Sequence, residues 1–191
     1  VSSVSQWELD LIAKGNCKHP VYGIREGGPA GAPPALAVTA EDMAAYRIEY
    51  VVAGVHWPLY VEKKREAVIR DYHRQMMFLA AHPLVTIIAH PWWWMGWWKD
   101  PNKNFYPDDP WLDDFAGKIP PSMHEEFAAA TREHGKVVEI NLSANLFNPA
   151  YPEAFAKDYL QYIGFLKSKG VRLSIGSDCH DGDYAIDFDK T

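Results

Sequence analysis

Five short apolar runs, rich in valine and isoleucine, alternate along the chain with longer segments of helical periodicity. Continuous apolar runs of this length, bounded by turn residues, are typical of strands buried on both faces of a sheet. The predicted strands are VYGIREG at 21–27, YVVAGVH at 50–56, VTIIAH at 85–90, KVVEIN at 136–141 and VRLSIGSD at 171–178.

The segments between these runs carry apolar residues at the spacing of amphipathic helices. Helices are predicted at 5–14, 40–47, 61–81, 122–134 and 152–169, and the Gly- and Pro-rich segment 27–35 is predicted to be an irregular loop. Strand and helix therefore alternate with connections of crossover length, which indicates parallel βα units. The predicted fold class is α/β, an incomplete TIM-like barrel with about five parallel strands.

Composition narrows the class of protein. The chain has 191 residues, 48% of them apolar, which is enough for one domain with a substantial core. The net charge is -6 and no basic stripe is present, which argues against a nucleic acid partner. No apolar run approaches the roughly 20 residues needed to cross a bilayer. Two cysteines, Cys17 and Cys179, do not make a disulfide framework, which suits a cytoplasmic protein.

Four of the predicted strands end in side chains that bind divalent metals. His56 and His90 each close a strand, Asp178 and His180 close the last one, and Glu26 closes the first. In parallel α/β barrels the carboxyl ends of the strands meet at one mouth, where such folds carry their chemistry. Imidazole nitrogens and carboxylate oxygens are suitable ligands for zinc and related ions. The pattern predicts a metal site at this end of the barrel.

The segments VHWP, IIAHP, VVEIN and GSDCHD, in this order, resemble the PHP family, named for polymerase and histidinol phosphatase. The resemblance spans roughly residues 21–182. It implies a distorted (β/α)7 barrel that holds up to three metal ions, usually zinc, manganese or iron, and a hydrolase activity on phosphate esters of small molecules. Clustered divalent metals serve that chemistry because they neutralise the phosphate and lower the pKa of bound water.

The resemblance also implies roles for individual residues. Glu26, His56 and His90 would hold one metal, with Glu26 in the place of the acidic ligand that bridges two ions. Asp178 and His180 would hold the other two. Beside these roles, we interpret Glu139 and Asn141 as residues that support the ligands or simply end their strand, rather than as ligands themselves.

One family feature has no counterpart here, because the HxH motif of the first strand is absent. We therefore interpret residues 1–191 as a single PHP-like domain truncated at its N-terminus, and the end at Thr191 agrees with a missing C-terminal element. One or two metals are expected in this chain, with poor catalysis and self-association through an exposed sheet edge. A natural, degenerate family member is the alternative to truncation.

The segment after His90 is dense in tryptophan. The lid candidates over the barrel mouth are Trp92, Trp93, Trp94, Trp97 and Trp98. A packing insert that buries its own indoles is the simpler alternative, and a dimer patch is a third.

Other residues receive structural interpretations. His73 and His82 belong to a helix and its end, and His124 and His134 are expected to be solvated. Ser122 and Glu125 have the spacing of a capping box for the helix at 122–134.

Two further functions stay open beside a phosphoesterase. The first is an amidohydrolase-type metal hydrolase or decarboxylase, which also uses histidines at strand ends and a late aspartate. The second is a non-catalytic PHP-like binding or scaffold module with a partial metal site.

Overall fold

The computed structural model describes residues 34, 36, 38–56, 64–94 and 110–178. Several predictions lie outside the described residues, namely the first helix and first strand, Cys17, Glu26, Trp97, Trp98, Cys179 and His180.

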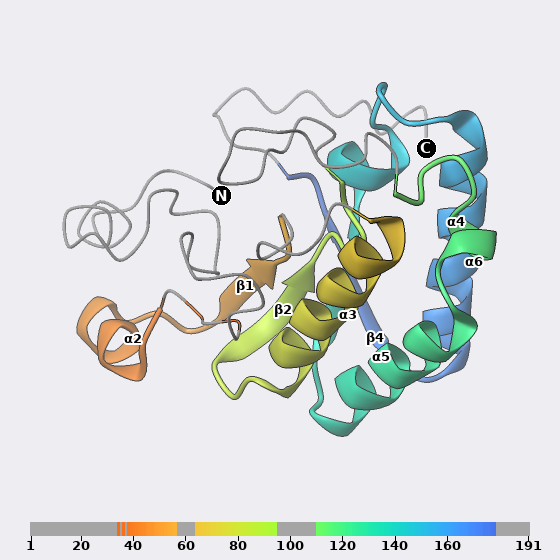
Figure 1. Cartoon of the computed structure of the whole chain (residues 1–191). Coiled ribbons are helices and arrows are strands. Elements are labelled where there is room, and N and C mark those ends of the chain that lie inside the picture. The colour runs from red at the N-terminus through yellow and green to blue at the C-terminus, as the bar shows by residue number, and fades with distance from the viewer. Residues whose placement is uncertain (1–33, 35, 37, 57–63, 95–109, 179–191) are drawn as a thin grey trace.

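A four-stranded, all-parallel sheet forms the centre of the described chain (Figure 1). Its strands are β1 (Val51–Gly54), β2 (Val85–Ala89), β3 (Val137–Asn141) and β4 (Arg172–Gly176), and they are paired in the order β1-β2-β3-β4. All four correspond to strands predicted from the apolar runs, so the α/β class is confirmed. Each crossover moves one strand further in the same direction, and right-handed crossovers of this kind place their helices on the same face.

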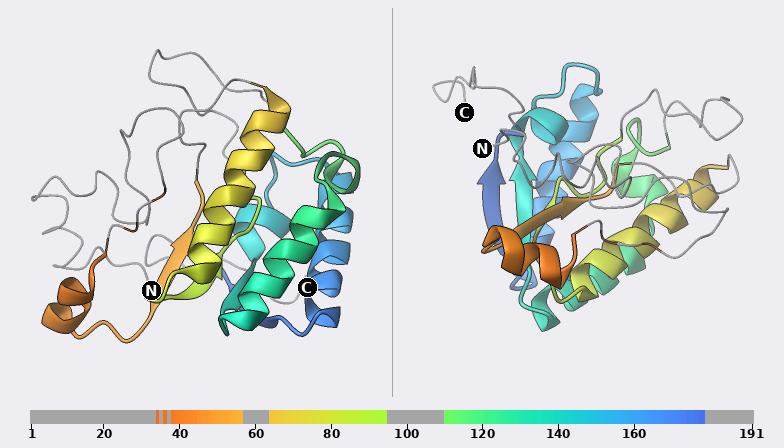
Figure 2. Two further views of the ribbon diagram at one scale, coloured as in Figure 1. Left: turned by 60° about the horizontal axis from the view of Figure 1, so that its bottom comes forward. Right: turned by 90° about the vertical axis from the view of Figure 1, so that its left-hand side faces the viewer.

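Helices alternate with the strands. They are α2 (Ala40–Tyr46), α3 (Arg65–Ala81), α4 (Phe115–Lys118), α5 (Pro121–Glu133), α6 (Glu153–Ser168) and the short π-helix η1 (Leu142–Leu146). Figure 2 shows α3, α5 and α6 gathered on one face of the sheet. The predicted helix at 152–169 is confirmed to within a residue at each end, and Gly170, with a φ of 78°, ends it in the left-handed conformation that glycine accepts.

Two helix starts differ from the sequence-based expectation. Helix α3 begins at Arg65, after the N-cap Lys64, and not at residue 61. Helix α5 begins at Pro121, and no side chain caps it, so the capping box of Ser122 and Glu125 is wrong. Proline at the first helical position already lacks the N–H that a cap would satisfy. Glu125 instead forms an ion pair with Lys169, 2.9 Å away.

The core lies between the sheet and its helical layer. Ala53, Ile88, Val138 and Leu173 lie side by side across the four strands. They belong to one apolar cluster with the buried side chains of α3, α5 and α6. Burial of a large apolar side chain contributes about 1.5–3 kcal/mol, so this cluster stabilises the packing of the helices on the sheet.

Candidate functional site

His56 and His90 meet at the carboxyl end of the sheet. His90 directly follows β2, His56 lies two residues beyond β1, and these strands are neighbours. The centroids of the two imidazole rings are 4.8 Å apart and the rings are nearly perpendicular. Both side chains are buried, with 6% of His56 and 4% of His90 exposed. The predicted convergence of these two histidines is therefore present in the structure.

Gly54, the last residue of β1, makes room for this pair. A Cβ placed on Gly54 would lie 2.5 Å from Cε1 of His90, a distance too short for two carbon atoms. The His90 ring therefore packs directly over the backbone of β1. Any larger residue at this position would displace the imidazole.

The backbone at the end of β2 is strained. His90 has a φ of 30° and Trp92 a φ of 63°, both in a region that residues with a Cβ rarely adopt. Such strain concentrates at functional sites, where surrounding contacts hold the backbone in place. Here the N–H of His90 donates a hydrogen bond to Oε2 of Glu139, 3.0 Å away.

Glu139 connects three strand ends. Its Oε2 also accepts a hydrogen bond from the side-chain amide of Asn141 at 3.0 Å. A Cβ on Gly176 of β4 would collide with the Glu139 carboxylate, so this glycine leaves the space that the carboxylate occupies. Asn141 also accepts from the N–H of Ala144 and thereby caps η1. Glu139 thus contacts the backbone of His90, and Asn141 contacts Glu139; the role of both residues as support for metal ligands stays a prediction.

The tryptophan segment after His90 divides into two parts. Trp92 and Trp94 are almost fully buried, with 1% and 2% of their surface exposed, and they pack against Trp111. These side chains form core, so a lid over the barrel mouth is the wrong interpretation for Trp92 and Trp94. The packing insert explains both.

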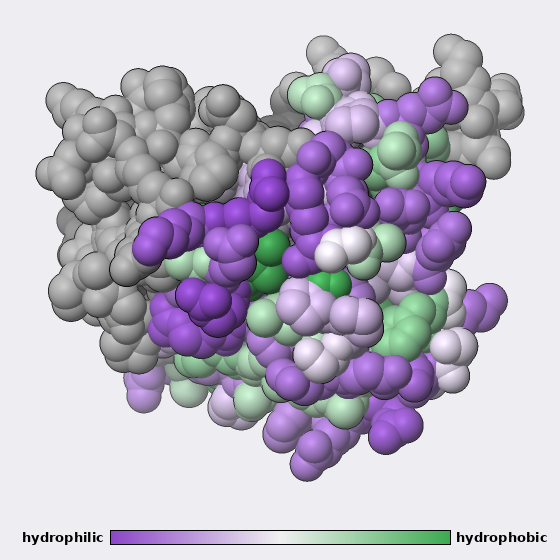
Figure 3. Space-filling view, turned by 45° about the vertical axis from the view of Figure 1, so that its right-hand side comes forward, coloured by the Kyte–Doolittle hydropathy of each residue, from purple (hydrophilic) through white to green (hydrophobic). Residues whose placement is uncertain are grey.

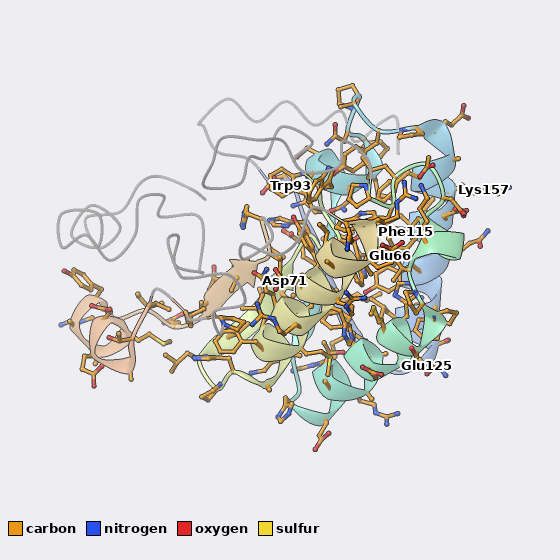
Figure 4. The ribbon with its side chains drawn as sticks, in the orientation of Figure 1. Glu66, Asp71, Trp93, Phe115, Glu125 and Lys157 are labelled. Carbon is orange, nitrogen blue, oxygen red and sulfur yellow. The ribbon has the colours of Figure 1, made fainter. Side chains whose placement is uncertain are left out.

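Trp93 differs from its neighbours. It is half-buried, and its ring centroid lies 5.4 Å from that of His56 and 5.1 Å from that of His90. Figure 4 shows Trp93 beyond the arrowheads of β1 and β2. Among the described lid candidates, Trp93 is the one that contacts the histidine pair.

Buried hydroxyl groups fix the backbone of this segment. The hydroxyl of Tyr151 accepts from the N–H of Trp94 and donates to its carbonyl, both at 2.7 Å. The hydroxyl of Tyr159 donates to the carbonyl of Pro91 at 2.9 Å. Burial raises the pKa of both tyrosines well above the usual value, so both stay protonated. The sequence offered no signal for these contacts, because the tyrosines lie about 60 residues away along the chain.

Asp178 lies two residues beyond β4, at the same end of the sheet as the histidine pair. It is half-buried and has a φ of 58°. The preceding carbonyl, that of Ser177, accepts a hydrogen bond from the hydroxyl of Ser143 on η1. Asp178 thus occupies a held, strained position like that of His90.

The described residues supply part of a metal site. Two imidazoles from neighbouring strands can bind one ion, and a catalytic zinc uses three protein ligands and water. No group of three or more His, Cys, Asp or Glu side chains able to hold a metal occurs among the residues that the structure describes. The ligand roles of all five candidates, Glu26, His56, His90, Asp178 and His180, stay predictions.

The other histidines are part of the helical layer. His73 lies 3.5 Å from the carboxylate of Glu126, and burial lowers its pKa. His134 is exposed, as expected. The expectation for His124 is wrong, because it is half-buried among aromatic rings, and burial followed by the nearby His73 lowers its pKa to about 4.

Comparison with known proteins adds no relative to this picture. No family model matches the chain, and neither a curated protein nor a solved structure matches it. None of the helices in the described residues combines the length and apolar character needed to cross a membrane.

Proposed function

We propose that this chain is a metal-dependent hydrolase domain that acts on a phosphate ester. The observation that carries the proposal is the pairing of His56 and His90 at the carboxyl ends of adjacent parallel strands. Parallel α/β folds place their chemistry at this end of the sheet. A carboxylate, Glu139, accepts a hydrogen bond from the backbone N–H of one of the two histidines, His90, and so fixes the backbone that carries this side chain.

A divalent metal at the histidine pair would supply the two things that phosphate ester hydrolysis needs. It would withdraw charge from the non-bridging oxygens and lower the pKa of a bound water molecule. The protein residues would hold and surround it: His56 and His90 donate nitrogen, Trp93 limits access of water from one side, and Glu139 fixes the backbone at His90.

The wider proposal follows the resemblance to the PHP family. The sheet would be part of an incomplete, distorted (β/α)7 barrel, which agrees with four parallel strands in sequential order. Asp178, at the same end of the sheet, would serve a further metal, and Glu26 and His180 would complete the ligand sets.

Metal analysis tests the proposal. The chain is loaded with zinc or manganese and dialysed exhaustively, and the bound metal is measured by elemental analysis. We expect roughly one ion per chain, and we expect His56→Ala and His90→Ala each to remove most of it, because so few ligands rarely hold zinc against solvent. His134→Ala, which removes an exposed histidine, is the matched control and should retain the metal. Stoichiometric metal in the His56→Ala/His90→Ala double mutant, or none in the loaded parent, would refute the assignment.

Turnover separates an enzyme from a binding module. The sequence lacks the HxH motif of the PHP family, which favours weak catalysis and keeps a non-catalytic scaffold as a second candidate. Hydrolysis of an aryl phosphate that depends on added metal and is lost in His56→Ala supports the enzyme. Tight metal binding without turnover of phosphate esters supports the scaffold.

A further inference from the structure

A pocket opens in the helical layer, away from the histidine pair. It lies between α4, α5 and α6, and its volume is about 220 Å³. The aromatic side chains Phe115, His124, Tyr162 and Phe165 line it. The volume is below the roughly 300 Å³ of a typical drug-sized site, so a ligand here would be small.

The walls of the pocket present ring faces. His124 stacks on Phe115, with centroids 5.6 Å apart and an interplanar angle of 27°, and it lies 4.6 Å from the ring of Tyr162. Figure 4 labels Phe115 on α4 and Glu125 on α5, two of the residues that line the pocket. Such aromatic surfaces bind apolar and aromatic groups, and their negative faces attract cations.

One ring already carries a cation. The ammonium of Lys169 lies over Phe165, 5.2 Å from the ring centroid, and also pairs with Glu125. The contact of Lys169 with Phe165 is of the same kind as the one that a ligand ammonium would make with the rings of the pocket. Because Lys169 pairs with the Glu125 carboxylate, Glu125 is not available to pair with the ammonium of a ligand. The carboxylate that remains available at the pocket belongs to another residue.

That residue is Asp158 on α6. Asp158 and Gln161 both line the pocket, and neither makes an ion pair or a side-chain hydrogen bond within the described part of the chain. His124 adds no competing positive charge at neutral pH, because burial and the nearby His73 lower its pKa to about 4. The pocket thus combines aromatic walls, a carboxylate and an amide oxygen, with its one histidine neutral. Figure 3 shows this side of the molecule, where apolar surface lies between hydrophilic side chains.

We propose that the pocket between α4, α5 and α6 is a binding site for a small organic ammonium ion with an aromatic or apolar body. The body fills the space between the rings, and the ammonium bonds Asp158 and Gln161 at the rim. The residues that line this pocket come from the helical layer and include neither His56, His90 nor Trp93, so the site is separate from the histidine pair. It is also independent of whether that pair binds a metal.

A set of three matched probes tests the charge requirement. The full chain is titrated with 3-phenylpropylamine, with the neutral 3-phenylpropan-1-ol and with 3-phenylpropanoate, and amide chemical shifts are followed by NMR. We expect the amine to bind with a Kd on the order of 1 mM or below, the alcohol several-fold more weakly and the carboxylate most weakly. Equal affinities for the three, or shifts that map away from α4, α5 and α6, would overturn the proposal.

Two variants locate the binding. Asp158→Asn should weaken the amine by about 3- to 5-fold and leave the alcohol unchanged, because one exposed ion pair is removed. Ala116→Trp, at an exposed position on α4 that lines the pocket, should block all three probes by filling the space. Glu133→Gln removes an exposed carboxylate at the end of α5 and should change nothing. Unchanged amine binding in both Asp158→Asn and Ala116→Trp, with the fold verified by circular dichroism, would refute the site.

Discussion

Histidines with little or partial exposure lie in two different environments of the described chain. His56 and His90 lie at strand ends, beside a strained backbone and a carboxylate that bonds it. His124 lies in the helical layer, where Phe115 and Tyr162 enclose its ring and its Nδ1 has no hydrogen-bond partner in the described structure. Reduced exposure of a histidine therefore does not by itself identify a candidate metal ligand. Placement at the carboxyl end of parallel strands, with polar support, distinguishes the first environment from the second.

The two environments should respond differently to loss of a glutamate. Glu139→Ala leaves two donors, the N–H of His90 and the amide of Asn141, without their acceptor, and we expect the free energy of unfolding to fall by about 4 kcal/mol. Glu125→Ala in the helical layer removes an exposed ion pair with Lys169, and the loss should be below about 1 kcal/mol. Urea denaturation measures both. Similar losses in the two variants would remove the distinction between the regions.

Acid should destabilise the helical layer through His124. The pKa of His124 is about 4 in the folded chain and has an ordinary value of 6.5, so between these pH values the unfolded chain binds a proton that the folded chain does not. The free energy of unfolding should therefore fall as pH drops from about 6.5 to 4, with a loss from this residue of at most about 3 kcal/mol.

Replacement of the titrating ring isolates that effect. His124→Phe keeps an aromatic side chain among the neighbouring rings, so the pH dependence in this window should become shallower. His73, whose pKa is also lowered by burial, will leave a residual slope of the same sign. His134→Phe, at an exposed position, is the control and should leave the profile unchanged. A parent-like profile in His124→Phe would contradict the assignment.

A pair of glycine substitutions gives the smallest expected difference. Gly54→Ala forces the His90 ring away from β1 and should cost about 2 kcal/mol through overpacking. Gly164→Ala on α6 meets nothing within 4 Å, and should stabilise the chain by about 0.5–1 kcal/mol because alanine favours the helix. Thermal unfolding compares them. Equally small effects of the two substitutions on thermal stability would show that the His90 ring has room to move at β1.

Local patterns predicted the elements whose signals are local. The strands β1 to β4 follow from continuous apolar runs, and α6 follows from helical spacing with Pro152 before it and Gly170 after it. The start of α5 was misassigned because both a proline start and a capping box are consistent with the same short segment, and the structure uses the proline.

The sequence alone determined that His56 and His90 come together, because residues that end neighbouring parallel strands must lie at one edge of the sheet.

It did not separate Trp93 from Trp92 and Trp94, since consecutive residues in an irregular segment have no periodicity that assigns them to core or surface. Nor did it show that His124 packs among aromatic rings, because that depends on Phe115 and Tyr162 from other helices. Tertiary structure decided both, through packing between segments far apart along the chain: Tyr151 and Tyr159 fix the tryptophan backbone, and α4 and α6 enclose His124.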